Sequence, residues 1–264
     1  MASTGEDATV LAGGRHPDRC SSVGQVEARI VGTGTELDRL PWARAAHTVA
    51  LEELAAVRTF PVQRGRRIAP GWWWSASTGR LVHYGFGAMR TQLMLLDHDP
   101  HVVALACSPV EFTWLGDDGA VAVHAPHLMA RLRDGSGLLV DCAGSEGVPA
   151  RIANHAAAMT TAVQAVGWHY RITQPPDPVL EANVRWLSGY RHPRYGAGIP
   201  REQVLALFEW PLPLIEGVRQ LGDPIAAWPV LFHALWSGAL TAPLNHPLHE
   251  RTLATAATVV AGPG

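Results

Sequence analysis

Residues 81–142, LVHYGFGAMRTQLMLLDHDPHVVALACSPVEFTWLGDDGAVAVHAPHLMARLRDGSGLLVDC, decide the fold of this chain. A short apolar helix is predicted around residues 89–96, and it ends at the DHDP turn because Pro100 disfavours helical backbone in the residue before it. Three apolar runs follow: HVVALAC, VEFTWL and a third run made of two pieces, VAVHAPHLMARL and GLLVDC. Asp118-Gly119 is a turn signal after VEFTWL, and Asp134-Gly135 is a turn signal between the two pieces of the third run. A second helix is expected at about 149–166 and a strand in GWHYRIT. The predicted order is helix, three strands, helix, strand.

That order resembles the TnsA-like endonuclease subunit of transposons, of actinobacterial type, a branch of the restriction-endonuclease-like fold. The resemblance covers roughly residues 58–252 and is densest in MRTQLMLLDHDPHVV, SPVEF, VHAPHLMARLRDG, LLVDC and ANVRWLSGYRHPR. It implies an α/β fold, with a restriction-endonuclease-like core (a mixed central sheet flanked by helices) and a small helical, winged-helix C-terminal domain. In such folds carboxylates hold a magnesium ion, which activates a water for attack on a DNA phosphate.

The residues that would carry this chemistry are replaced in this sequence. Gly85 and Met89 stand where the resemblance implies two glutamates, and the expected Pro-Asp pair is Pro126-His127. The expected acid-x-Lys is Asp141-Cys142-Ala143, and the chain has no lysine at all. Arginine stays protonated and does not replace a lysine that positions water. Asp141 is then the one remaining candidate metal ligand, and we expect a nuclease fold without its nuclease.

Two other sets of side chains contain residue types that bind metals. His124, His127, Cys142 and His155 are ligand types that zinc accepts. His124 and His127 are three apart on a predicted strand, however, so their side chains would point to opposite faces unless Pro126 distorts it. Asp141 could alternatively share a divalent ion with Glu111 or Glu146. We favour a structural role for these side chains, and we read Asp97 and Asp99 as structural residues of a turn.

A basic cluster lies just before three consecutive tryptophans, Trp72, Trp73 and Trp74. Arginines for phosphates and aromatic faces for bases are found together in nucleic-acid grooves. The alternative, which we prefer, is that alternate tryptophans of a strand pack on the core. The candidate DNA-binding residues are Arg64, Arg66, Arg67, Trp73, Arg131, Arg133, Arg191 and Arg194.

The chain divides into four parts by composition. Residues 1–24 have no apolar periodicity and are expected to be a disordered tail. An N-terminal arm follows at 25–80 and a nuclease-like core at 81–173. The proline-rich TQPPDP then separates the core from a C-terminal domain at 177–255. Several short helices and a hairpin are predicted in that domain, and the winged-helix resemblance makes residues 227–236 its recognition helix. This helix is a poor reader of DNA because it has no arginine and only His233 as a polar side chain.

Composition narrows the classes of function. The net charge is −2 at pH 7, which argues against a strongly basic, non-specific binder of nucleic acid. The 3 cysteines imply no disulfide framework, and neither a signal-peptide pattern nor a long apolar run is present. We therefore expect a cytoplasmic protein with no membrane partner.

Three functions follow as hypotheses. We favour a catalytically degenerate TnsA-like protein that binds DNA or acts as a scaffold in a nucleoprotein complex, with no cofactor. The second is a pure interaction module that binds a protein partner or a second copy, with its former cleft filled by Phe86, Met89, His127 and Cys142. The third is an active Mg²⁺-dependent endodeoxyribonuclease with substituted ligands.

Overall fold

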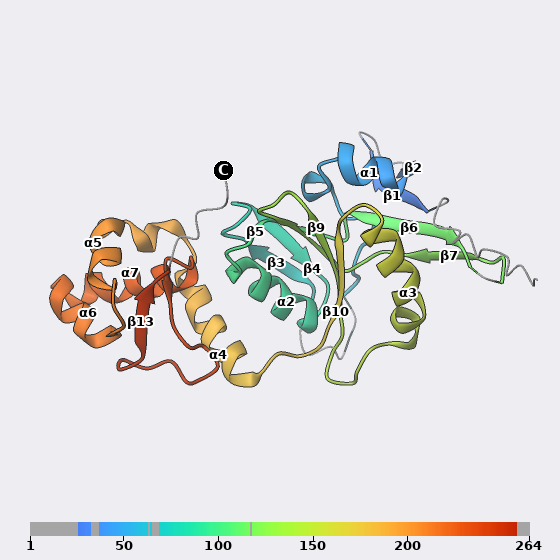
Figure 1. Ribbon diagram of the computed structural model, residues 1–264. Helices are drawn as coiled ribbons and strands as arrows, with labels where there is room; N and C mark the ends of the chain where they lie inside the picture. Colours follow the sequence, from blue (N-terminus) through green and yellow to red (C-terminus); the bar gives the residue numbers. More distant parts are fainter. Residues whose placement is uncertain (1–25, 33–36, 63, 65–68, 117, 258–264) are drawn as a thin grey trace, which may run out of the picture.

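The structure is a computed structural model that describes residues 26–32, 37–62, 64, 69–116 and 118–257. It is a mixed α/β protein, as expected (Figure 1). The expected tail at 1–24 lies outside the described residues.

The central sheet has the strand order β10-β9-β8-β5. Strands β5, β8 and β9 pair antiparallel, and β10 pairs parallel to β9 after the crossover helix α3. The elements of this unit are α2 (Gly87–His98), β5 (Val102–Cys107), β8 (Leu128–Leu132), β9 (Gly137–Cys142), α3 (Ala150–Gln164) and β10 (His169–Thr173). The helices α2 and α3 and the strands β5, β9 and β10 lie where the sequence predicts them, but VEFTWL, which the sequence counts among the three strand runs, is not part of this sheet.

A second sheet interrupts this unit, and one part of the strand prediction was therefore wrong. The run VAVHAPHLMARL is not one strand: it forms β7 (Val121–His124) and, after the Ala125-Pro126 bend, β8 in the other sheet. Strands β6 (Val110–Leu115) and β7 pair with each other, and β6 also pairs with β1 (Glu27–Val31), which pairs with β2 (Leu37–Pro41). A proline lacks the backbone N–H that a central strand needs, which explains the break.

Local signals explain several element ends. Helix α2 ends at His98, before the Asp99-Pro100 pair, as predicted. Gly135 turns β8 into β9 with φ 87°, a backbone conformation that favours glycine. Ser108 has φ 40° where β5 leaves the central sheet, and its N–H donates to the carbonyl of His127. The change of sheet is therefore fixed by the same link that carries His127.

The N-terminal arm, predicted at 25–80, supplies side chains to both hydrophobic clusters. Besides β1 and β2 it contains α1 (Trp42–Thr48), the 3-10 helix η2 (Leu51–Glu53) and β3 (Gly71–Trp74). Strand β3 pairs antiparallel with β4 (Leu81–Tyr84), the first strand of the predicted core. The Trp42 ring packs on Phe112 and Trp168 at centroid distances of 4.7 and 5.2 Å, and its indole N–H donates to the Ala162 carbonyl. A hydrophobic cluster between β1, β6 and α3 is built around it.

The C-terminal part is mainly helical with a small sheet of order β11-β13-β12. Asp177 caps its first helix, and Pro178 occupies the first turn, where the missing N–H has no cost. The elements are α4 (Pro178–Leu187), η3 (Ser188–Tyr190), η4 (Pro193–Gly196), α5 (Arg201–Leu207), β11 (Leu212–Pro213), α6 (Leu214–Leu221), α7 (Pro224–Trp236), β12 (Leu240–Thr241) and β13 (Leu253–Ala256).

The C-terminal part shares a hydrophobic cluster with the central sheet. Met89 and Leu128 belong to the same cluster of buried side chains as Val184 and Leu231. Helix α4 lies between the two parts of the molecule (Figure 1). The predicted boundary at 177 therefore marks a change of architecture, while the apolar packing continues across it.

Candidate functional site

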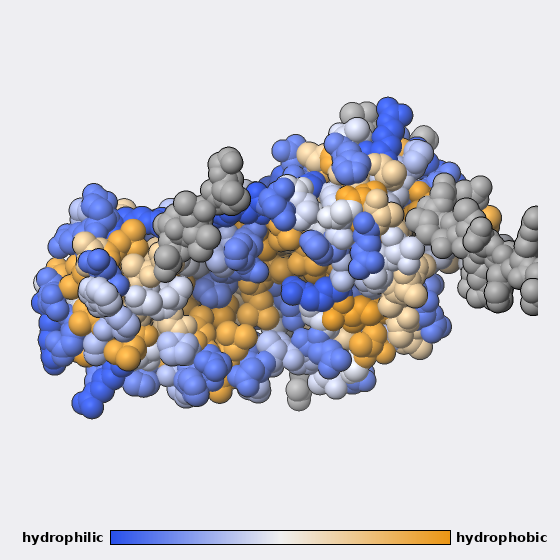
Figure 2. Space-filling view, viewed as in Figure 1, coloured by the Kyte–Doolittle hydropathy of each residue, from blue (hydrophilic) through white to orange (hydrophobic). Residues whose placement is uncertain are grey.

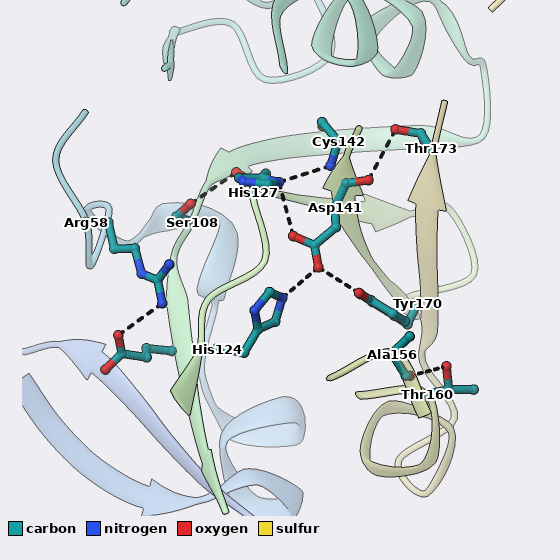
Figure 3. Close-up of polar contacts among 11 residues, drawn as sticks. Arg58, Ser108, His124, His127, Asp141, Cys142, Ala156, Thr160, Tyr170 and Thr173 are labelled. Atoms are coloured by element: carbon teal, nitrogen blue, oxygen red, sulfur yellow. Dashed lines mark hydrogen bonds and ion pairs between the residues drawn. The ribbon is translucent and has the colours of Figure 1, made fainter. Parts of the chain in front are cut away.

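Asp141 is the centre of a buried polar cluster (Figure 3). It is the second-last residue of β9, and it is approached by His124 at the end of β7, His127 in the link between β7 and β8, and Tyr170 in β10. Atom His124 Nε2 lies 2.6 Å from Asp141 Oδ2, and the Tyr170 hydroxyl donates to the same oxygen at 2.6 Å. The Asp141 and His124 side chains are 0% and 1% exposed. The carboxylate is thus enclosed by side chains from two other strands and one link.

His127 completes the cluster on the other carboxylate oxygen. Its Nδ1 lies 3.0 Å from Asp141 Oδ1, and the same Nδ1 is 3.0 Å from the backbone N–H of Cys142. An unprotonated Nδ1 accepts from Cys142, whereas a protonated Nδ1 donates to Asp141, so one proton decides which bond forms. Within the described residues no hydrogen bond reaches Asp141 Oδ1 while Nδ1 accepts from Cys142.

The surroundings shift the pKa values of the acidic groups in the cluster. Burial raises the pKa of Asp141, but hydrogen bonds with His124 and His127, and the charge of both rings, outweigh burial and hold the pKa below its usual value. Burial and the adjacent carboxylate raise the pKa of the Tyr170 hydroxyl. Asp141 therefore stays ionised and Tyr170 stays a donor at neutral pH.

Apolar side chains fill the space around Gly85 and Met89, the two positions at which the resemblance implies glutamates. A Cβ built on Gly85 would overlap the ring of Phe60. Met89 is completely buried, and its sulfur accepts from the Gly85 N–H at 3.4 Å. The ring of Phe86 packs on His127 at 5.1 Å. A longer polar side chain at 85 would have to displace Phe60 before it could reach this space.

Ala143, which stands where the resemblance implies a lysine, is also buried. It is 2% exposed, and its N–H donates to the Thr173 carbonyl at 2.8 Å as β9 and β10 end together. The side-chain position after β9 is thus enclosed by the parallel strand pair.

His124 and His127 do not point to opposite faces: the strand is broken at the link that contains Pro126, which is the stated exception, and both rings face Asp141. Even so, within the described ranges no group of three or more His, Cys, Asp or Glu side chains is arranged to hold a metal ion. Burial raises the pKa of the Cys142 thiol to about 12, so the thiolate that zinc requires is disfavoured. His155 packs its ring against His124 at 5.4 Å.

Glu111 does not share a site with Asp141. Its carboxylate pairs with Arg29 at 2.5 Å and with Arg58 at 3.4 Å. On β6 it alternates with Phe112, which is buried in the second sheet's core. Asp141 is therefore left with nitrogen and hydroxyl neighbours, which do not fit the oxygen-ligand set and bound waters that magnesium prefers.

The tryptophan run alternates as the core-packing interpretation predicts. Trp73 is only 6% exposed, and its indole N–H donates to Asp97 Oδ2 at 2.9 Å, so its proposed role in stacking on DNA is contradicted by its burial. Trp72 is 64% exposed and packs beside His83 at 4.9 Å. Arg64 is exposed, while Arg66 and Arg67 lie outside the described residues.

Two of the remaining candidate arginines are used inside the protein. Arg131 makes two hydrogen bonds to Glu52, at 2.8 and 3.1 Å, and lies 4.7 Å from the Trp168 ring centroid. Arg191 donates to the carbonyls of Trp74 and Ser188. Neither guanidinium is available to bind a phosphate without first losing these bonds, which argues against both as primary DNA contacts.

The other two candidates are exposed. Arg133 donates to the Pro100 carbonyl at 2.9 Å, and Arg194 lies 4.8 Å from the Tyr195 ring centroid. Each keeps donors on the surface.

Most of helix α7 is packed inside the C-terminal part. Phe232 contacts Tyr190 and Trp186 at 4.9 and 6.1 Å, and His233 Nδ1 lies 2.8 Å from the Tyr190 carbonyl oxygen. Only the apolar first turn, including Ile225, is exposed. The expectation that α7 is a poor reader of DNA agrees with this packing.

Sequence reasoning missed Tyr170 and Phe60. Tyr170 lies one strand over from Asp141 on the same face, because Ile172 pairs with Asp141 and side chains alternate. The period of two in GWHYRIT could have placed Tyr170 there once the parallel pairing was assumed. No local signal in the sequence places Phe60 over Gly85.

Comparison with known proteins gave no relative: no protein-family model matches the chain, and no curated protein matches it significantly. Among the described residues, no helix has both the length and the apolar character needed to cross a membrane.

Proposed function

We propose that this chain is a TnsA-like protein of the restriction-endonuclease-like fold whose catalytic centre has become a buried structural cluster, and that it acts as a DNA-binding scaffold in a nucleoprotein complex. The observation that carries the proposal is the enclosure of Asp141. This residue aligns with the family's metal-binding acid, yet its carboxylate is 0% exposed and is taken up by His124, His127 and Tyr170.

The topology supports the fold assignment. The unit from α2 to β10 has three antiparallel strands, a crossover helix and a parallel fourth strand, with Asp141 at the end of the third. The C-terminal order α5, β11, α6, α7, β12, β13, with β13 between β11 and β12, supports a winged-helix arrangement.

The chemistry of the cluster supports the loss of hydrolysis. Magnesium keeps several waters and needs oxygen ligands in octahedral geometry. Here the positions aligned with catalytic residues hold Gly85 against Phe60, the buried Met89, His127, and the buried Ala143. A hydrated ion and a DNA phosphate would both have to displace these side chains.

The surface supports local rather than diffuse DNA contact. The exposed Trp72 packs beside the half-buried His83 in a groove that Arg58 and Arg80 also line, together with Glu52 and Glu53. Because α7 is covered, DNA would be bound by this arm and by exposed arginines such as Arg133 and Arg194. The two described cysteines are buried free thiols, which suits a reducing cytoplasm.

Plasmid nicking with Mg²⁺ or Mn²⁺, alongside titration calorimetry with each ion, tests the loss of catalysis. We expect no nicking and no saturable heat. Nicking by the wild type that Asp141→Ala abolishes would show a working nuclease and overturn the proposal. Binding of a labelled duplex should weaken steeply between about 50 and 200 mM salt, because phosphate contacts release counterions.

Protein contact is a second candidate function, favoured by exposed apolar side chains on the C-terminal part. Ile225 is 85% and Trp210 is 76% exposed. Figure 2 shows apolar patches over both the core and the C-terminal helices. If these residues join two copies, light scattering should report a dimer that Ile225→Asp with Trp210→Ala converts to a monomer. A wild-type monomer at high concentration would exclude that form of contact.

A further inference from the structure

The segment from Trp186 to Gly196, WLSGYRHPRYG, carries aromatic and basic side chains with no acidic residue between 188 and 200. It forms the end of α4, η3 and η4. Trp186 is 58% exposed, although a side chain of this size is usually mostly buried. An exposed aromatic surface with cationic neighbours is a candidate binding site.

The rings of this segment lie in series. Trp186 and Tyr190 have centroids 6.2 Å apart, and Tyr190 and Tyr195 have centroids 5.3 Å apart. An open groove of about 560 Å³ is lined by Ala182, Arg185, Trp186, Gly189, Tyr190 and Tyr195. A Cβ built on Gly189 would meet no atom within 4 Å, so the floor of the groove is clear at this position.

The backbone beneath the rings is held from behind. Arg191 donates to the Trp74 carbonyl at 2.8 Å and to the Ser188 carbonyl at 2.6 Å, and its guanidinium lies 4.3 Å from the Trp73 ring centroid. His233 bonds the Tyr190 carbonyl, and Phe232 packs under the Tyr190 ring. The surface is therefore preorganised, which lowers the entropy cost of binding a flexible ligand.

Positive charge lies at one end of the series. Arg194 is exposed, and its guanidinium lies 4.8 Å from the Tyr195 ring centroid, with a donor to the Tyr195 hydroxyl. His192 is exposed and stacks on Trp74 at 4.8 Å. Arg185, at the other end, is paired with Glu181. A polyanion that crosses the rings would meet Arg194 without an acidic side chain from this segment beside it.

We propose that this surface, the Trp186 platform, binds unpaired nucleotides of a single-stranded nucleic acid. The bases stack on Trp186 and the two tyrosines, and Arg194 binds a backbone phosphate. Stacking suits every base because each has a π-face, and cationic grooves with aromatic rings are the usual means of such binding. The inference rests on the proposed DNA-binding function and deepens it, because it makes DNA with separated strands the form that this surface recognises.

Fluorescence anisotropy with labelled oligo(dT) and oligo(rU) of about twelve nucleotides, and with a duplex of the same length, tests the platform. Trp186→Ala should weaken oligo(dT) binding by at least about fivefold, the lower end of what one stacked base contributes. Leu115→Ala removes a similarly exposed apolar side chain outside the groove, 54% against 58% for Trp186, and should leave binding unchanged. Arg194→Gln should lower the salt slope by about 0.7, as for one phosphate contact on a single strand.

The outcomes separate this inference from the function on which it rests. Equal loss of oligo(dT) binding in the Trp186 and Leu115 variants, or no loss in either, overturns the platform. Duplex binding with weaker oligo(dT) binding overturns the platform alone. No binding of any oligonucleotide at about 50 mM salt overturns both proposals and leaves the exposed rings as a protein contact. Tighter binding of oligo(rU) than oligo(dT) would support the platform and identify RNA as its source of unpaired bases.

Discussion

His124 Nε2 lies 2.6 Å from Asp141 Oδ2, and this contact joins the two sheets of the molecule. His124 ends β7 in the second sheet, whereas Asp141 is in β9 of the central sheet. Both side chains are almost wholly buried, at 1% and 0% exposure. A polar bond in such surroundings has little competition from water, so the loss of one partner leaves the other uncompensated.

The buried cluster around Asp141 should contribute to the stability of the fold. Asp141→Ala should lower the free energy of unfolding by about 3 kcal/mol, because it leaves His124 and Tyr170 without their acceptor in a buried site. Urea denaturation measures the difference. Glu53→Ala, which removes an exposed carboxylate, should change stability by less than about 0.5 kcal/mol. An equally small effect of Asp141→Ala would contradict a structural role for the cluster.

Acidification should remove the stabilisation that the ionised Asp141 carboxylate provides. Although burial alone would raise the Asp141 pKa, His124 and His127 hold the folded pKa below the 3.8 of a free carboxyl. For a depressed pKa, stabilisation is complete above the unfolded value and is lost as pH falls through the folded value. The stability difference between wild type and Asp141→Asn should therefore shrink below pH 3.8. Urea denaturation across this range checks it, and a difference that grows on acidification would contradict the pKa shift.

The sequence predicted the order of the central unit because its signals are local. The DHDP turn, the glycine at 135 and the capped, proline-started α4 act within a few residues. Asp97 was read as structural, and it does accept from Trp73 and Ser75 in the folded chain. The excursion of β6 and β7 into another sheet depends on pairing with β1, about eighty residues earlier, which no local pattern encodes.

The candidate site was harder to predict, for the same reason. Asp141 could be singled out from its place at a strand end, but its burial depends on side chains from β7, β10 and the link at 125–127. The sequence also does not show that Arg131 and Arg191 are occupied by internal partners, so both were predicted to be free to bind DNA. Their partners, Glu52 and the Trp74 carbonyl, are 79 and 117 residues away.

Arg131 should behave as a structural residue. Burial raises the pKa of Glu52, but the hydrogen bonds and charge of Arg131 outweigh it and the pKa is lowered. The Arg131 guanidinium makes two hydrogen bonds to the Glu52 carboxylate and also stacks on Trp168. Arg131→Ala should therefore lower the unfolding free energy by about 1 to 2 kcal/mol. Arg133→Ala, at an exposed site, should cost less than about 0.5 kcal/mol.

Duplex-binding measurements on the same two variants separate structure from DNA contact. If Arg133 binds a phosphate, its variant loses affinity at unchanged stability, whereas the Arg131 variant loses stability and keeps its affinity at temperatures where it is folded. A loss of affinity in folded Arg131→Ala with normal stability would assign this residue to the DNA interface instead.

Asn183 holds the long loop between β12 and β13 against α4. Its Nδ2 donates to the carbonyls of Leu244 and His246 at 2.8 and 2.7 Å, and its Oδ1 accepts from the Leu248 N–H at 3.1 Å. Loops held by few contacts open at low free energy. Asn183→Ala should therefore speed amide hydrogen exchange across residues 244–249 while exchange in β9 stays slow.

The matched control for the loop is Asn245→Ala. Asn245 is an exposed residue of the same loop, so it tests whether a change of composition alone alters exchange. Equal protection of the loop in wild type and Asn183→Ala would mean that the three hydrogen bonds do not hold it. Faster exchange in the Asn183 variant alone would show that these three hydrogen bonds tether the loop between β12 and β13 to α4.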